Sequence, residues 1–230
     1  MKYDPVKKTL QFVPALITLD GSGLQAVIKH PSNGIFVLVQ TAEKSFADLA
    51  GHWAAKDTEL LATKGIIDGI ADNRFAPEGV LTRAEIASLL VRAAGLEEKA
   101  LSAATMNDVR GDDWYAGYVQ AAVSAGLIDG YEDGTFRAGA AVTREELAVL
   151  LTRALKLAGR PAEGTGTAAA AFTDSTSVSA WAKDAVRTAQ VAGLVNGLED
   201  GSFRPQAQAT RAEAAVMIKR YLLKAEFMNE

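Results

Sequence analysis

Three arginines occupy the same place in three short stretches, "LTRAE" (81–85), "VTREE" (142–146) and "ATRAE" (209–213). In each stretch a threonine and a glutamate three residues later form the Thr-x-x-Glu pattern of a helix capping box, and an apolar helical pattern follows. The arginine comes directly after the cap, where a cation opposes the helix dipole by about 0.3–1 kcal/mol. A charge at this position therefore has a reason other than helix stability. The arginines are Arg83, Arg144 and Arg211.

Anion binding is one chemistry that these arginines could perform. Free backbone amides at a helix N-terminus attract anions, and a guanidinium adds two parallel donors that match a carboxylate. Nearby tryptophan and tyrosine side chains could supply a flat apolar surface for a sugar ring. In this interpretation the arginines are exposed, and replacing them with alanine should abolish binding with little change in melting temperature. The alternative is pairing with neighbouring acidic residues at the surface, worth about 0–1 kcal/mol per pair.

The arginines belong to three copies of one larger unit. Tryptophans recur at spacings of 61 and 67 residues, and a phenylalanine and the capping threonine repeat the same two spacings. The six additional residues before the third copy fall in the Gly-, Ala- and Thr-rich stretch "GRPAEGTGTAAAA". We therefore predict three repeats, at residues 46–96, 106–157 and 172–223.

Each repeat is predicted to be a helix, a turn and a second helix. The first helix begins near the tryptophan and ends at a glycine, which suits the left-handed position just past a helix end. A tight turn follows, and the phenylalanine that ends it (Phe75, Phe136 or Phe203) is expected in the core. Downstream of each capping threonine, apolar residues fall at offsets of four, seven, eight and eleven, which is one face of an α-helix.

The three second helices are each too short to be stable alone, so their apolar faces should bury against one another. We expect a mainly α fold, in which the three repeats form a pseudo-threefold trimer around a central three-helix bundle, with the first helices outside. The predicted buried residues are Ile86, Leu89, Leu90, Ala93, Leu147, Leu150, Leu151, Ala154, Ala214, Met217, Ile218 and Tyr221.

Residues 1–45 have a different, β-rich pattern. "LQAVIKH" alternates, "GIFVLVQ" is rich in β-forming residues, and "PSNG" between them carries the Asn-Gly signal of a hairpin. "LQFVPALITLD" with "DGSG" indicates one more strand. Three antiparallel strands are marginal alone, so we interpret the segment as the tail of an upstream β-sandwich domain. The start also lacks the layout of a secretion signal, which agrees with a fragment of a longer polypeptide.

Composition argues against several classes of function. The chain has 230 residues and a net charge of −4 at pH 7, which gives no footprint for nucleic acid. It contains no apolar run long enough for membrane insertion. The absence of cysteine excludes disulfides and thiolate metal sites.

Catalysis and metal binding also have little support in the sequence. The only histidines are His30 and His52, and no candidate nucleophile recurs in the repeats. The acidic turns "YEDGTF" and "LEDGSF" lack the alternating ligand spacing of a calcium loop. We therefore expect no enzyme activity, no cofactor and no metal.

The combined pattern resembles the S-layer homology (SLH) domains that attach exported proteins to bacterial cell walls. The resemblance is carried by "FADLAGHWA" to "GIIDGIADNRFAPEGVLTRAE" and by the matching stretches of the other two repeats, and it covers about 180 of the 230 residues. It implies a pseudo-trimeric, extracellular protein of the cell wall or S-layer. Its expected partner is a secondary cell wall polysaccharide, held non-covalently in grooves between neighbouring repeats. This polymer often carries a pyruvate ketal, whose carboxylate would be the anion.

The resemblance also implies which residues bind the glycan. The arginines would meet the ketal carboxylate, the tryptophans would line the groove, and glycine backbones would approach the sugar; the opening aspartates match a further position of the family pattern. Two alternatives remain open, since the tryptophans could be core residues and the aspartates could cap helices or turns. Repeat two departs from the pattern at Met106, which replaces the initial phenylalanine. The candidates are Arg83, Arg144, Arg211, Trp53, Trp114, Trp181, Asp48, Asp108, Asp174, Gly69, Gly130 and Gly197.

Two other functions fit the same sequence. A helical-repeat scaffold could bind a protein or peptide, although it would not need three arginines beside its caps. The chain could also be the wall-binding part of a glycosidase whose catalytic domain lies upstream.

Overall fold

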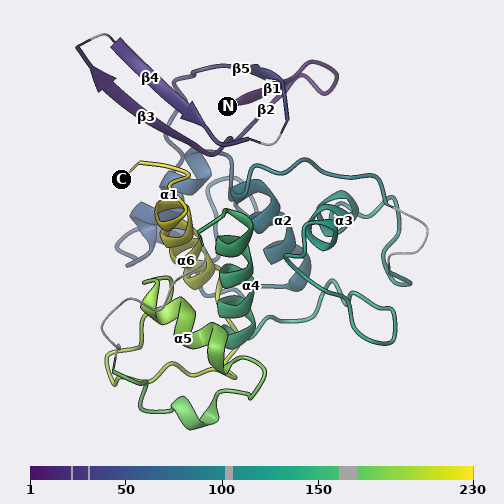
Figure 1. Ribbon diagram of the computed structural model, residues 1–230, viewed down its shortest axis with the longest axis vertical. Coiled ribbons are helices and arrows are strands. Elements are labelled where there is room, and N and C mark those ends of the chain that lie inside the picture. The colour runs from purple at the N-terminus through teal and green to yellow at the C-terminus, as the bar shows by residue number, and fades with distance from the viewer. Residues whose placement is uncertain (22, 31, 102–105, 161–169, 230) are drawn as a thin grey trace.

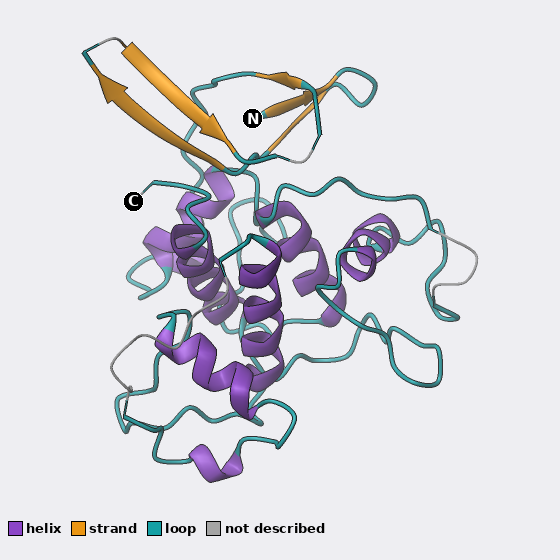
Figure 2. Ribbon diagram, viewed as in Figure 1, coloured by secondary structure: helices purple, strands orange, loops and turns teal. Residues whose placement is uncertain are grey.

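The computed structural model describes residues 1–21, 23–30, 32–101, 106–160 and 170–229. Within them the fold is mainly α, as expected, and a few short strands precede the helices (Figure 1 and Figure 2). Two 3-10 turns, η1 (Ala47–Leu49) and η2 (Ser175–Ser177), open the first and third repeats. The helices are α1 (Ala55–Thr63), α2 (Arg83–Ala93), α3 (Ala116–Ser124), α4 (Arg144–Leu157), α5 (Lys183–Val191) and α6 (Arg211–Lys224).

The helix ends follow the predicted local signals. The first helices α1, α3 and α5 are each followed two residues later by a glycine with positive φ, Gly65, Gly126 and Gly193. The second helices α2, α4 and α6 each begin with a complete capping box. In every box the threonine hydroxyl accepts from the glutamate amide and the glutamate carboxylate accepts from the threonine amide, so the predicted caps are confirmed.

All three repeats share one hydrophobic core. The predicted apolar face of each second helix is buried in it, and the turn phenylalanines Phe75, Phe136 and Phe203 are completely buried. Both predictions are therefore confirmed. Because each apolar face is buried in a core shared with other repeats, the helices stabilise one another rather than standing alone.

The two helices of one repeat do not form the main packing pair. Each first helix instead contacts the second helix of the preceding repeat: α3 contacts α2, α5 contacts α4, and α1 contacts α6. The second helices α4 and α6, and α2 and α6, also contact each other (Figure 1). Because α1 is the first helix and α6 the last, this order joins the two ends of the repeat array.

Hydrogen bonds between the segments that precede the second helices close the same circle. The amide of Leu81 donates to the carbonyl of Ala209 at 2.9 Å, Ala209 donates to Val142 at 2.8 Å, and Val142 donates to Leu81 at 3.0 Å. All three residues are buried, so each of these bonds satisfies backbone groups that water cannot reach. The ring fixes the starts of α2, α4 and α6 relative to one another.

The N-terminal segment is β-rich, as predicted, but its strands pair differently from the prediction. β3 (Ala15–Asp20) and β4 (Gly23–Ile28) form a hairpin, while β2 (Thr9–Gln11), β1 (Lys2–Asp4) and β5 (Ile35–Phe36) form an antiparallel sheet in that order. The predicted hairpin across "PSNG" is therefore wrong, because the strand after this turn pairs with β1 rather than with β4. The Asn-Gly signal reports only that the chain can turn there, and the edge of β1 provides the partner.

This β-rich segment contacts the end of the helical body at which the chain ends. The amide of Ala15 donates to the carbonyl of Phe227 at 2.9 Å, and Lys29 pairs with Glu226 at 3.1 Å. Val13 is buried, and Phe12 packs against the shared core. In Figure 1 the strands lie beyond the ends of α1 and α6.

Tyr221 in α6 offers a test of the core. Its side chain is completely buried, and its hydroxyl makes no hydrogen bond within the described part of the chain. Replacing Tyr221 with phenylalanine removes an unsatisfied polar group, and we expect the free energy of unfolding to rise by about 1 kcal/mol in urea denaturation. Tyr118→Phe is the control, since its hydroxyl accepts from Nε of Arg92 at 3.3 Å and its loss should not stabilise the protein. A less stable Tyr221→Phe variant would contradict the prediction.

Candidate functional site

The three arginines that follow the caps are buried, so the prediction that they are exposed is wrong. Arg83, Arg144 and Arg211 are only 8%, 4% and 8% exposed. Each guanidinium points into the next repeat in the circle, and its Nε donates to the carbonyl of that repeat's turn phenylalanine. Position N1 of a helix predicts exposure only when no neighbour covers the helix start, and here the adjacent repeat covers it.

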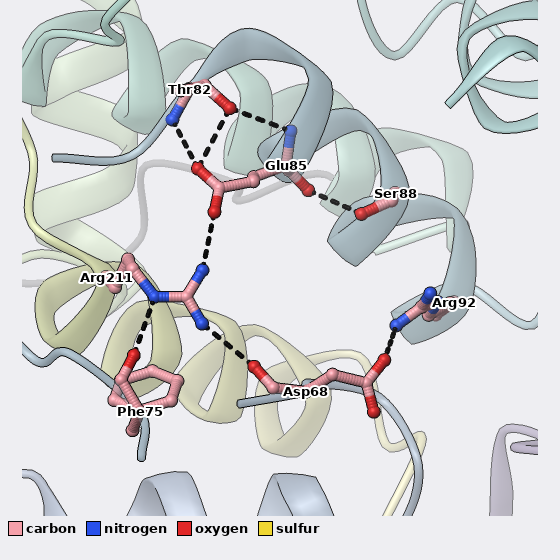
Figure 3. Close-up of polar contacts among 7 residues, drawn as sticks. All are labelled: Asp68, Phe75, Thr82, Glu85, Ser88, Arg92 and Arg211. Atoms are coloured by element: carbon pink, nitrogen blue, oxygen red, sulfur yellow. Dashed lines mark hydrogen bonds and ion pairs between the residues drawn. The ribbon is translucent and has the colours of Figure 1, made fainter. Parts of the chain in front are cut away.

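Arg211 shows the arrangement most completely (Figure 3). Its Nε donates to the carbonyl of Phe75 at 2.9 Å and its Nη2 to the carbonyl of Asp68 at 2.8 Å. Its Nη1 lies 2.6 Å from Oε1 of Glu85, whose other oxygen caps Thr82. Arg211 thus joins repeat three to the capping box of repeat one, which is a buried pairing rather than the surface pairing considered from the sequence.

Arg144 and Arg83 are variations of this arrangement. Arg144 donates to the carbonyl of Phe203 at 2.6 Å and pairs with Glu213, the capping glutamate of repeat three. Arg83 donates from Nη2 to the carbonyl of Asp129 at 2.7 Å, and its guanidinium carbon lies 4.7 Å from the centre of the Tyr131 ring. All three guanidiniums lie over the ring of a turn phenylalanine, but among the described residues only Arg83 also contacts a tyrosine ring, while the other two each pair with a carboxylate.

The three tryptophans lie at the surface. Trp53, Trp114 and Trp181 are 64%, 60% and 61% exposed, which rules out the alternative that they belong to the core. A large exposed aromatic side chain in each repeat leaves apolar surface in contact with water, and its ring can stack on a flat ligand.

The aspartates at the start of each repeat cap the tight turns. The two carboxylate oxygens of Asp48 accept from the amides of Phe75 and Ala76 at 2.9 and 2.7 Å, and the amide hydrogen bonds, that of Phe75 first, lower the pKa of Asp48. Ala76 has a φ of 58°, so the carboxylate stabilises a strained turn. Asp108 and Asp174 make the same pairs of bonds in repeats two and three. The turn-cap alternative therefore accounts for all three aspartates.

The three candidate glycines are closely packed inside each repeat. A Cβ atom on Gly69 would lie 2.7 Å from the ring of Phe46, and one on Gly130 would lie 2.5 Å from the sulfur of Met106. Phe172 occupies the same place beside Gly197, at 3.1 Å. Met106 thus fills the position of the phenylalanine that it replaces, and the departure of repeat two from the pattern preserves the packing.

One groove brings together predicted residues from all three repeats. It has a volume of about 370 Å³ and contains Trp53 of repeat one, Arg144 of repeat two and Gly197 of repeat three. Here the exposed indole, the backbone of a glycine and a guanidinium face a common space. The remaining lining residues are Asn196, Leu198, Glu199, Glu213, Val216, Met217 and Arg220.

Arg220 and Asn196 of this groove were not among the residues predicted from the sequence. A comparison of the repeats could have found them, because the position of Asn196 is an aspartate in the other two repeats. The circular order of the repeats was the missing information, since Trp53 and Arg220 are far apart in the sequence and meet only when α1 lies on α6.

The acidic turns that were considered and rejected as calcium loops are held by their own side chains. Asp200 accepts from the hydroxyl of Ser202 at 2.6 Å and pairs with Arg204, and these contacts lower its pKa to about 2. Thr135 and Arg137 hold the pKa of Asp133 at about 2 in the same way. Both carboxylates act as turn caps in the described structure.

The fold and the groove define a helical protein of three repeats in circular order, with exposed aromatic residues beside a shared ligand-sized space. Residues 45–87, 105–148 and 171–215, together more than half of the chain, match the family model of the S-layer homology domain. The chain therefore belongs to the S-layer homology family.

Relatives with the same domains include enzymes and surface proteins. The chain is 35% identical, over 80% of its length, to an amylopullulanase from Thermoanaerobacterium thermosulfurigenes, and covers 10% of that protein. It is 31% identical over 68% of its length to a cellulosome-anchoring protein from Acetivibrio thermocellus, covering 35%, and 30% identical over 81% to an S-layer protein from Bacillus thuringiensis subsp. finitimus, covering 22%. It thus spans about a tenth to a third of the length of these relatives. No helix in the described ranges has the length and apolar character to cross a bilayer.

Proposed function

We propose that this chain anchors an exported protein non-covalently to the bacterial cell wall by binding a secondary cell wall polysaccharide. The observation that carries the proposal is the groove in which Trp53, Arg144 and Gly197 of three different repeats line one space. An exposed indole provides a face for a sugar ring, and polar groups around it fix the orientation of the ring. The protein would act outside the cell, at the cell surface.

The names of the relatives support an anchoring role. One is a cellulosome-anchoring protein and another is an S-layer protein, and in both the matched region is a minor part of the whole. A module that occurs in proteins of such different overall function is expected to supply attachment rather than a particular activity.

Two further grooves of the same kind are part of the proposal. The circular order of the repeats predicts that Arg211, Gly69 and Trp114 form one of them and that Arg83, Gly130 and Trp181 form the other. Several weak sites on one chain would raise the overall affinity for a repetitive polymer through avidity. We also propose that the ligand is pyruvylated, so that its carboxylate meets the basic side of a groove.

The repeats are inferred to surround an approximate threefold axis, with α2, α4 and α6 as the central bundle. The ring of hydrogen bonds among Leu81, Val142 and Ala209 supports this arrangement, since each repeat donates one bond and accepts one. The packing of every first helix on the preceding repeat supports it as well.

The β-rich segment 1–45 would belong to, or border, an upstream domain of the same polypeptide. The similarity to an amylopullulanase and to an exoglucanase favours a specific version of this proposal, in which the parent protein is a glycosidase held at the wall. Expression of the longer gene product and an assay on starch and cellulose would test that version.

Replacing Trp53 with alanine tests the binding site. We expect the affinity for purified cell walls to fall about tenfold or more, as for a tryptophan contact worth about 1.4 kcal/mol, while the melting temperature changes little because the side chain is exposed. Co-sedimentation with walls, and with walls stripped of their polysaccharide, measures the effect. Leu19→Ala is the control, because Leu19 is an exposed apolar residue of the β-rich segment, far in sequence from any candidate site. Equal sedimentation of Trp53→Ala and the unmodified chain would refute the assignment of the groove.

A further inference from the structure

In two repeats, an arginine near the end of the second helix forms an ion pair with the aspartate that directly precedes the candidate glycine. Arg92, ten residues after the capping threonine of repeat one, lies 2.5 Å from the carboxylate of Asp68 (Figure 3). The corresponding Arg153 of repeat two lies 2.7 Å from the carboxylate of Asp129. Both arginines therefore form an ion pair with a carboxylate of the same chain.

Repeat three keeps the arginine but lacks the aspartate. The arginine is Arg220, and the aspartate position is occupied by Asn196. With the amide of Asn196 in the orientation that satisfies its neighbours, its oxygen accepts from Nη2 of Arg220 at 3.1 Å. An amide accepts a hydrogen bond but carries no charge, so the contact leaves the guanidinium charge uncompensated.

No other carboxylate takes the place of the missing one. Burial has the larger effect on the pKa of Arg220 and lowers it, while the carboxylate of Asp57 in α1 raises it, and Oδ1 of Asp57 is bound to Lys219 at 2.7 Å. Arg220 makes no ion pair with any residue that the structure describes. Partial burial lowers its pKa, yet an arginine remains charged at any physiological pH. The protein thus holds an unpaired cation in a partly desolvated position.

Arg220 lines the groove that contains Trp53 and Gly197. Arg144 lies in the same groove and uses Nε and Nη1 for internal partners, while its Nη2 makes no hydrogen bond within the described residues. The corresponding Nη2 atoms of Arg83 and Arg211 both donate to a backbone carbonyl. At this groove, among the described residues, Nη2 of Arg144 lacks the carbonyl contact that the other two cap arginines have, and Arg220 lacks the carboxylate that pairs with Arg92 and Arg153.

The acidic side chains of this groove do not neutralise the positive charge of Arg220. Glu213 uses one carboxylate oxygen for Arg144 and the other for the amide of Thr210, so it is already neutralised. Glu199 is exposed, where water screens its charge. An incoming anion would meet Arg220 without displacing an internal carboxylate.

We propose that Arg220 determines the specificity of this groove for an acidic sugar, by binding the carboxylate of the ligand while Trp53 stacks on the ring. The inference rests on the proposed function and adds a residue that distinguishes one groove from the other two. Asn196 leaves Arg220 able to bind the ligand, because an aspartate at that position would form an ion pair with Arg220, as in repeats one and two.

The test uses the full chain and two short wall saccharides, one with a pyruvate ketal and the same saccharide after removal of the ketal. NMR titration follows the indole N–H signal of each tryptophan separately. The signal of Trp53 reports on the groove that contains Arg220. We expect Arg220→Gln to weaken binding of the acidic saccharide at Trp53 about tenfold or more, with a change of less than about twofold for the neutral one. Arg153→Gln is the matched control and should alter neither titration at Trp53.

A second variant keeps every arginine in place. Asn196→Asp restores the pairing found in repeats one and two, and we expect it to weaken binding of the acidic saccharide about as much as Arg220→Gln.

The outcomes separate this inference from the proposed function. If the unmodified chain prefers the acidic saccharide at Trp53 and Arg220→Gln keeps that preference, the role of Arg220 is refuted while wall binding stands. Equal affinity of the unmodified chain for both saccharides likewise refutes acid recognition alone. If neither saccharide shifts any indole signal and walls are not bound, the proposed function fails and the inference fails with it.

Discussion

Replacing Arg211 with alanine is expected to lower the free energy of unfolding by about 3 kcal/mol. The substitution removes three hydrogen bonds that join repeat three to repeat one, and it leaves Glu85 without its cation. Removing one member of a buried pair typically costs about 3–5 kcal/mol, and the lower end applies because a quarter of the Glu85 side chain is exposed. Urea denaturation followed by tryptophan fluorescence measures the change, with an unchanged slope as the sign of a pure stability effect.

An exposed arginine provides the control for this experiment. Arg110 pairs with Asp112, and both side chains are largely exposed, so Arg110→Ala should change the stability by less than about 0.5 kcal/mol. A comparably small effect of Arg211→Ala would restore the interpretation made from the sequence, in which the arginine is free to meet a ligand and contributes little to the fold.

Removing repeat three is expected to abolish cooperative folding of the rest of the chain. A chain that ends at residue 160 has α1 without α6, and Leu81 and Val142 lose their hydrogen-bond partner Ala209. The β-rich segment would lose its contacts to Phe227 and Glu226 as well. We expect partial helicity by circular dichroism and no sigmoidal urea transition, because the core is shared by all three repeats.

Adding the missing part separately distinguishes lost contacts from lost connectivity. A peptide of residues 170–230 mixed with the truncated chain should restore a cooperative transition, since it supplies α6 and Ala209 and with them the contacts to repeats one and two. A truncated chain that unfolds cooperatively by itself would show that repeats one and two form an independent unit, which contradicts the shared core.

Local features of the fold could be predicted from the sequence. The capping boxes depend on residues three positions apart, and the buried faces of α2, α4 and α6 depend on offsets within one helix, so spacing alone reveals both. The burial of Phe75 follows from its place after a tight turn. The tight turn itself was expected, although its cap, the carboxylate of Asp48, lies 27 residues from the amide of Phe75 that it accepts from.

Features that depend on the neighbouring repeat could not be predicted in the same way. The sequence around Arg211 predicts an exposed helix start. Its burial comes only from contacts with Phe75 and Glu85, which lie more than a hundred residues away in the chain. The pairing of β5 with β1 is also non-local, and it prevailed over the hairpin signal of the intervening turn. For the same reason the groove at Trp53 becomes visible only when the first and third repeats are placed side by side.

The contact between α1 and α6 also sets the number of repeats. Open solenoids can grow by one unit at a time, because each added unit packs on an exposed terminal face. Here the terminal faces cover each other, so a fourth unit inserted into the chain would find no free helix to pack on and would have to break the existing closure. Stronger attachment to a surface would therefore come from additional complete sets of three or from assembly of several chains, rather than from lengthening this one.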